Sequence, residues 1–85
     1  MTMTKSELLA VATPQQRKIL EAIQANPYAN NERIGQIVGM EKRTIDAQMN
    51  LFYKRVPELL AIERYARRTV LLDWLREYSQ EEQYP

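Results

Sequence analysis

Polar and charged side chains recur at helical spacing between residues 42 and 54, and their types suit hydrogen bonding to nucleic-acid bases. On a helix the following residues share one face: Lys42, Arg43, Asp46, Ala47, Asn50 and Lys54. An arginine such as Arg43 can donate two parallel hydrogen bonds to guanine, and Asn50 can pair similarly with adenine in the major groove. The carboxylate of Asp46 can accept from cytosine or repel other bases. The pattern predicts a helix whose outward face contacts the edges of base pairs.

Other side chains near this face suit phosphate groups or the protein fold better than bases. The following cations are expected to contact the phosphate backbone: Lys42, Lys54, Arg55 and, on the preceding segment, Arg33. Thr44 is as suited to supporting the turn before the helix as to contacting DNA. Arg17 could contact phosphate or brace the domain from within. Asn30 and Asn31 could reach phosphate, but we favour their capping the helix that follows.

Two consecutive helices are predicted to hold this face outward. Ile34 and Val38 lie four residues apart, which indicates a short helix with one buried face. Gly39 follows where a left-handed residue would end that helix, and Gly35 within it indicates that another backbone approaches closely. The second helix begins near Lys42 and carries this apolar stripe: Ile45, Met49, Phe52 and Val56. Two helices joined in this way are the layout of a DNA-binding helix-turn-helix.

Two helix-start signals precede this pair of helices. Thr4 and Glu7 match a capping box, so we expect a short helix or an arm over residues 1–12. A threonine cap followed by proline opens the segment 13–16, which predicts a helix to about Ala25. The chain is therefore interpreted as an all-α single domain whose helix-turn-helix core spans residues 13–56.

Residues 57–79 are predicted to form one further helix, because a proline begins the segment and no glycine interrupts it. No hairpin signal is present, so no β-wing is expected. The apolar residues of this helix fall into two clusters that point in nearly opposite directions. The second cluster consists of Leu71, Trp74, Leu75 and Tyr78. The acidic tail, residues 80–85, is expected to fray.

One helix cannot bury two opposite faces against one small core, which leaves two arrangements open. Either the helix breaks near residues 67–69 and Trp74 completes the core of the monomer, or the second cluster packs against a partner. We favour the partner, a second copy of the chain, because DNA-binding proteins of this layout commonly use two-fold symmetry. Leu71, Trp74, Leu75 and Tyr78 would then form the dimer interface.

Composition narrows the function classes. The 85 residues suffice for one small domain, and neither cysteine nor histidine is present. These absences remove the best zinc ligands and the commonest general base, so no metal, cofactor or enzymatic activity is predicted. No apolar run reaches the length of a membrane span and the start lacks a usable signal peptide, which predicts a cytoplasmic protein with no membrane partner.

Charge is weak support for nucleic-acid binding overall but is unevenly distributed. The formal net charge is only +1. Eight basic and four acidic residues fall between positions 33 and 68, whereas residues 69–85 carry one basic and four acidic residues. The positive charge thus gathers on and just after the predicted base-contacting helix. A solvated helical surface of mixed sign is the alternative explanation.

The segment 13–56 resembles the LuxR-type (GerE-like) helix-turn-helix of bacterial transcription regulators. The opening motif of that family is matched by Thr13, Pro14, Arg17, Ile19 and Leu20. Its central motif is matched by Ile34, Gly35, Val38, Gly39, Met40, Glu41, Thr44 and Ile45. Glu41 replaces the usual serine cap, and Gln48 and Met49 replace other usual residues, so the family's base preference does not transfer. A weaker resemblance, through Leu59-Leu60-Ala61-Ile62, is to small lambdoid-phage activators with an oligomerising C-terminus.

The sequence is compatible with two functions. The first is a sequence-specific transcription regulator that binds double-stranded DNA through the helix of about residues 42–55, as a homodimer. RNA polymerase or another regulator could be a further partner. The second is a small helical adaptor in which the same fold binds a protein, such as RNA polymerase or a phage or host factor.

Overall fold

The structure, a computed structural model, describes residues 3–83, with side chains as far as residue 76. All regular structure in that part of the chain is helical, which confirms the predicted all-α class. The α-helices are, in chain order, α1 (Lys5–Val11), α2 (Pro14–Ala25), α3 (Asn31–Val38), α4 (Lys42–Lys54), α5 (Pro57–Leu60) and α6 (Arg67–Gln83), with a 3-10 turn η1 (Arg64–Ala66) before α6. No helix in the described range combines the length and apolar character that a membrane span requires.

The first three helices begin at side-chain caps that the sequence predicts. The Thr4 hydroxyl accepts from the amide of Glu7, whose carboxylate accepts from the Thr4 amide, so the N-terminal segment starts as a helix. Thr13 and Gln16 form the same reciprocal pair at the start of α2. Asn30, rather than Asn31, caps α3 by accepting from the amide of Arg33. Each cap satisfies amide groups that a helix start leaves without intrahelical partners.

Two glycines set how α3 turns into α4. Gly39 ends α3 with φ 76° and ψ 36°, the left-handed conformation that favours glycine. Gly35 is buried within α3, and a Cβ atom there would overlap the carbonyl oxygen of Met40. The same approach lets the Met40 amide donate to the Gly35 carbonyl at 2.8 Å. The predicted close approach of another backbone at Gly35 is therefore confirmed, and the approaching segment is the turn before α4.

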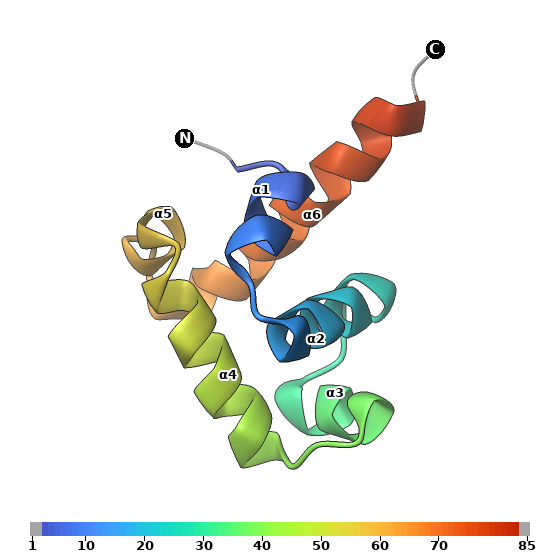
Figure 1. Ribbon diagram of the computed structural model, residues 1–85, viewed down its shortest axis with the longest axis vertical. Coiled ribbons are helices and arrows are strands. Elements are labelled where there is room, and N and C mark those ends of the chain that lie inside the picture. Colours follow the sequence, from blue (N-terminus) through green and yellow to red (C-terminus); the bar gives the residue numbers. More distant parts are fainter. Residues whose placement is uncertain (1–2, 84–85) are drawn as a thin grey trace.

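One hydrophobic core joins all six α-helices. In Figure 1, α1 lies beside α6, whereas α2, α3 and α4 group at the other end of the molecule, with α5 linking α4 to α6. The largest fully buried apolar side chains include Leu8, Ile19, Leu20, Ile23, Ile34, Ile45, Phe52, Leu59, Leu71 and Leu75. The short helix α1 is thus part of the packed domain, since Leu8 is fully buried.

The prediction of one helix over residues 57–79 is wrong. The chain forms the four-residue helix α5, turns, passes through η1 and only then enters α6 at Arg67. The Arg67 guanidinium stabilises this break, because it donates to the backbone carbonyls of Leu59, Leu60 and Ile62 at 2.9–3.2 Å. Leu59 and Leu60 are the last two residues of α5 and Ile62 lies just beyond it, at a helix end where carbonyls lack i+4 partners. The alternative of a broken helix is thus confirmed, with the break just before the expected position.

The break also overturns the expected dimer interface. Leu71, Trp74 and Leu75 are 0%, 5% and 1% exposed within a single chain, where they belong to the core shared with α1 and α2. Reorienting α6 relative to α5 places Leu59 and these three side chains in the same core, so no partner is needed to cover the three. Tyr78, the fourth predicted interface residue, lies outside the described side chains, as does the tail 80–85.

Candidate nucleic-acid interface on α4

Helix α4 has one buried side and one side that faces solvent. Ile45, Met49 and Phe52 are buried, as the predicted apolar stripe requires. The opposite side, here called the outer face, consists of Arg43, Ala47, Asn50, Leu51 and Lys54, all of which are exposed. The base-contacting residues expected from the sequence therefore fall into two groups, because Lys42 and Asp46 line a hollow on the flank of α4, which Asn50 also borders.

The polar side chains of the outer face are available to a ligand. Arg43 donates from Nε to the Glu41 carboxylate at 2.8 Å, but the two side chains are 87% and 70% exposed. A surface pair of this kind is worth about 0–1 kcal/mol, so a phosphate or base could displace Glu41 at little cost. Asn50 and Lys54 make no hydrogen bond within the described part of the chain. These three side chains can thus meet a partner without first breaking the fold.

Asp46 instead joins α4 to the start of α3. Its two carboxylate oxygens accept from Lys42 Nζ at 2.9 Å and from Asn31 Nδ2 at 2.7 Å. The hydrogen bonds from Lys42 and then Asn31 hold the pKa of Asp46 below its ordinary value. Because Asn31 holds one of its oxygens from α3, we assign Asp46 to the packing of α3 against α4 rather than to base contact. Lys42 is held on this flank through Asp46, by an ion pair whose side chains are 58% and 40% exposed.

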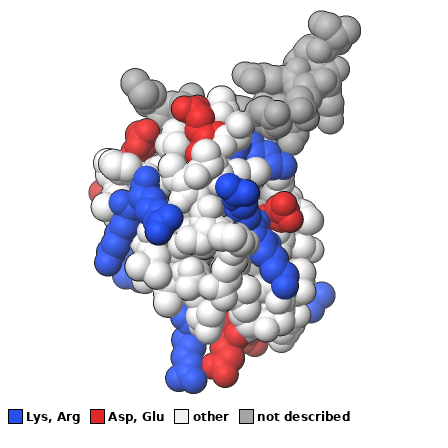
Figure 2. Space-filling model, in the orientation of Figure 1, with Lys and Arg blue, Asp and Glu red and all other residues white. Residues whose placement is uncertain are grey.

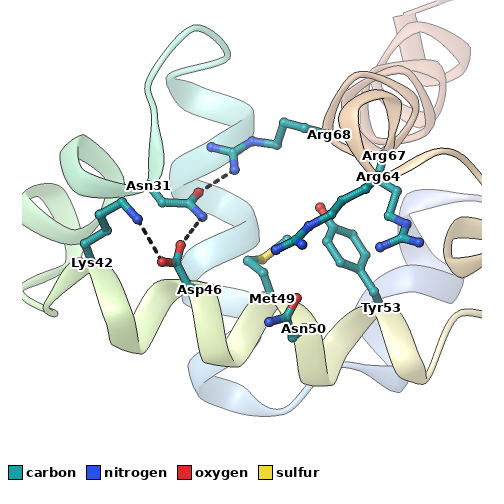
Figure 3. Close-up of a pocket in the computed structure, with 9 residues that line it drawn as sticks. All are labelled: Asn31, Lys42, Asp46, Met49, Asn50, Tyr53, Arg64, Arg67 and Arg68. Carbon is teal, nitrogen blue, oxygen red and sulfur yellow. Dashed lines mark hydrogen bonds and ion pairs between the residues drawn. The ribbon is translucent and has the colours of Figure 1, made fainter.

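Arg68 extends this network to α6. Its Nη1 donates to Asn31 Oδ1 at 2.7 Å, and its Nη2 donates to the Ala29 carbonyl at 2.9 Å. Figure 3 shows Asn31 between Arg68 and Asp46, so one side chain connects three helices. No local pattern marks this role of Arg68, because it is one of several arginines in a basic stretch and its partners lie 37 and 39 residues away.

Other predicted phosphate contacts have partners in the fold. Arg55 donates from Nη1 to the Val11 carbonyl at 3.1 Å, and Arg17 donates from Nε to the Leu9 carbonyl at 2.9 Å. Both carbonyls belong to the last turn of α1, so two arginines from different helices hold its C-terminal end. The bracing alternative for Arg17 is therefore confirmed. Arg33 remains exposed on α3 and donates to Gln36 at 3.1 Å, and Thr44 is half-buried in the first turn of α4.

A hollow of about 330 Å³ lies on the flank of α4 that faces η1 and the start of α6. Four cations, Lys42, Arg64, Arg67 and Arg68, line it together with Asp46. Figure 3 shows Arg64 extending from η1 toward Met49 and Asn50 on α4. The hollow was not predicted, because η1 and the start of α6 were expected to be the middle of one straight helix.

The surface charge does not form one continuous basic patch on the face drawn in Figure 2. Basic side chains stand in separate groups there, with uncharged surface between them and acidic side chains close to several. A nucleic-acid interface on this face would therefore depend on particular side chains rather than on a continuous region of positive charge.

Comparisons with protein-family models, with curated proteins and with solved structures found no match to this chain. The resemblance to LuxR-type regulators therefore stays a prediction.

Proposed function

We propose that this protein is a sequence-specific DNA-binding regulator of transcription that inserts the outer face of α4 into the major groove. The observation that carries the proposal is the division of α4 into a buried stripe and an outer face whose polar side chains are free of the core. Base contact requires such donors to project from a rigid element without structural duties.

The order of residues along the outer face suits a helix that enters the groove by its first turns. Arg43 lies in the first turn, where helices of this kind commonly contact base edges. Ala47 follows one turn later, and its small side chain permits close approach to a base or a thymine methyl group. Asn50 comes next, and Lys54 in the last turn can reach a phosphate group, as can Arg33 on α3.

A homodimer remains part of the proposal, but its interface cannot be the cluster predicted from the sequence. Leu71, Trp74 and Leu75 of that cluster are buried within a single chain. The architecture of the DNA site would report oligomeric state directly. An inverted repeat requires two copies related by two-fold symmetry, whereas a single half-site is sufficient for one copy.

The test is selection of bound sites from a random pool of duplex DNA at near-physiological salt. We expect the unmodified chain to enrich a defined motif. Arg43→Ala should lose preference at one position of that motif, with a cost of about 1–3 kcal/mol. Arg76→Ala on α6 is the charge-matched control, because Arg76 is exposed and has no interaction within the described residues, and it should keep the full motif.

A folded protein that enriches nothing would contradict the proposal. Equal loss of affinity in Arg43→Ala on all sequences, with an unchanged motif, would instead move Arg43 from base contact to phosphate contact.

One observation favours the second candidate function, a helical adaptor that binds a protein. Leu51 lies within the outer face and is 49% exposed, although it is a large apolar side chain. A large apolar side chain at the centre of this face could pack into the apolar core of a protein interface, whereas it adds no hydrogen bond to a base. Trp74 gives this candidate no support, because it is buried. Leu51→Lys distinguishes the two functions, since it should abolish binding of a protein partner such as RNA polymerase, whereas DNA binding should retain its steep dependence on salt.

A further inference from the structure

The hollow beside α4 gathers more positive than negative charge within the described part of the chain. Lys42, Arg64, Arg67 and Arg68 line it, and Asp46 is its only carboxylate within the described range. That carboxylate already accepts from Lys42 and Asn31. None of the three arginines forms an ion pair with that carboxylate within the described residues, and Arg64 interacts with it only through longer-range electrostatic attraction. Three arginines thus face a cavity lined by a single carboxylate, an arrangement suited to an anion.

Two of these arginines are held in place before any ligand arrives. The Arg67 guanidinium donates to three backbone carbonyls and lies 5.9 Å from the centre of the Tyr53 ring. The Arg68 guanidinium is fixed by Asn31 and Ala29. Side chains that are already ordered lose little further freedom on binding, so a ligand meets a preformed wall.

The remaining hydrogen-bonding capacity also points to a ligand with acceptor oxygens. The Nε atom of Arg68 is buried and has no hydrogen-bond partner within the described residues. Arg64 is exposed, lines the hollow and makes no hydrogen bond within the same range. An oxyanion in the hollow would offer acceptors to both, and Figure 3 shows the Arg64 side chain extending toward Asn50 on α4.

We propose that this hollow is a binding site for a phosphate group, with Arg64 as the contact that closes on the ligand and Arg68 as part of the fixed wall. Guanidinium groups match the oxygens of phosphate with paired hydrogen bonds. The cavity of about 330 Å³ falls at the small end of pockets that hold organic ligands, so the phosphate belongs to a larger molecule.

The same chemistry has two possible sources. One is a small phosphorylated molecule, of the size of a nucleotide. The other is the backbone of a DNA strand that passes the flank of α4 while the outer face lies in the groove, because Asn50 belongs to both surfaces. Only this second source depends on the proposed function.

The first experiment follows the side-chain Nε–Hε signals of the arginines by NMR in ¹⁵N-labelled protein. Pyrophosphate and adenosine monophosphate are added separately at constant ionic strength. For a small-molecule site we expect saturable shifts of the Arg64 and Arg68 signals. Arg64→Ala should weaken binding at least tenfold, and Arg76→Ala should leave it unchanged.

The second experiment measures affinity for a duplex of arbitrary sequence as a function of salt concentration. Loss of one phosphate contact lowers the slope of log affinity against log salt by about 1. For a backbone site we expect this decrease in Arg64→Ala and not in Arg76→Ala. Thermal melts of both variants should stay close to that of the unmodified protein, because neither side chain makes a hydrogen bond or ion pair within the described part of the fold and Arg64 interacts with Asp46 only at longer range.

Each pattern of results decides the proposal. Saturable shifts that Arg64→Ala abolishes support a small phosphorylated ligand, and a reduced salt slope supports the DNA backbone. If the folded protein showed neither the saturable shifts nor the reduced salt slope, the proposed site would be overturned. Failure of the proposed function is distinct, because it would appear as loss of motif enrichment in the unmodified chain while pyrophosphate binding could persist. Conversely, Arg64→Ala should keep the motif even when its overall affinity falls.

Discussion

The two sides of α4 that carry polar residues use the same residue types in opposite ways. On the outer face, Arg43 has only an exposed ion pair and Lys54 makes no hydrogen bond within the described residues. On the flank, Lys42 and Asp46 belong to a network that continues through Asn31 to Arg68. The position of a lysine or arginine around α4 therefore decides whether its side chain is available to a ligand or hydrogen-bonds within the fold.

This contrast separates binding from stability. Changes on the outer face should alter what α4 contacts and leave the free energy of unfolding nearly unchanged. Changes on the inner side and flank should lower stability and affect binding only through the loss of folded protein. Substitutions at Gly35, Arg68, Arg55 and Asp46 test this distinction, in order of decreasing effect on stability.

Gly35→Ala, in α3, should lower the free energy of unfolding more than the other substitutions, because Gly35 contacts the turn that leads into α4. The added Cβ would overlap the Met40 carbonyl oxygen, a backbone atom that can move only if the turn before α4 opens. We expect the free energy of unfolding to fall by about 3 kcal/mol, the upper end of the usual cost of overpacking. Chemical denaturation measures it.

Gly39→Ala is the matched control for that substitution. A Cβ at Gly39 meets open space, so only its positive φ opposes the change, and the cost should be about 1 kcal/mol. If Gly35→Ala cost no more than Gly39→Ala, the close approach of α3 to the turn would not control this packing.

Arg68→Met should come next, because it removes the link between α6, α3 and α4 while keeping an apolar stem. Two hydrogen bonds from a charged group are lost, to Asn31 and to the Ala29 carbonyl. We expect a loss of about 2 kcal/mol in the free energy of unfolding, since the polar groups left behind are only partly accessible to water. Arg76→Met, an exposed change on the same helix, should alter stability by less than about 0.5 kcal/mol. Similar values for both variants would contradict the role given to Arg68.

Arg55→Ala and Lys54→Ala compare two neighbouring cations on α4. Arg55 donates to the Val11 carbonyl at the end of α1, whereas Lys54 projects from the outer face. Arg55→Ala should destabilise the fold by about 1 kcal/mol and Lys54→Ala by less than about 0.5 kcal/mol. Binding to duplex DNA should show the reverse order once both variants are fully folded. Equal effects on stability would mean that the hydrogen bond to Val11 contributes little.

Local signals explain why much of the fold could be predicted from sequence. Thr4, Thr13 and Asn30 cap helices through contacts three residues away. Apolar residues recur every three or four positions along α4, and this spacing determines its buried side. Gly39 has the positive φ expected of a residue that ends a helix. Each of these features depends on neighbours in the chain, so spacing alone reveals it.

The rest could not be predicted, because it depends on contacts between distant segments. No glycine or proline marks the break between α5 and α6, which depends on Arg67 donating to the carbonyls of Leu59, Leu60 and Ile62. That break buries Trp74 and creates the arginine-lined hollow. The links from Arg68 to Asn31 and from Arg55 to Val11 span 37 and 44 residues, and nothing local distinguishes these arginines from free ones.

The smallest expected effect concerns the pH dependence of the flank network. Hydrogen bonds from Lys42 and Asn31 hold the pKa of Asp46 below 3.8, its ordinary value. A carboxyl whose pKa is lower in the folded state stabilises the fold above its unfolded pKa, and this contribution disappears as pH falls through the folded pKa. At about pH 6 the unmodified protein should therefore be more stable than Asp46→Asn, by at most about 1 kcal/mol because the pair with Lys42 is largely exposed. The difference should shrink as pH falls below about 4, where the carboxyl becomes protonated.

Chemical denaturation at both pH values measures the difference, and a ¹³C titration of the carboxyl should place its midpoint below 3.8. A gap that stays constant across this range would show that the charge of Asp46 does not hold α4 against α3, and the flank would then differ from the outer face only in packing.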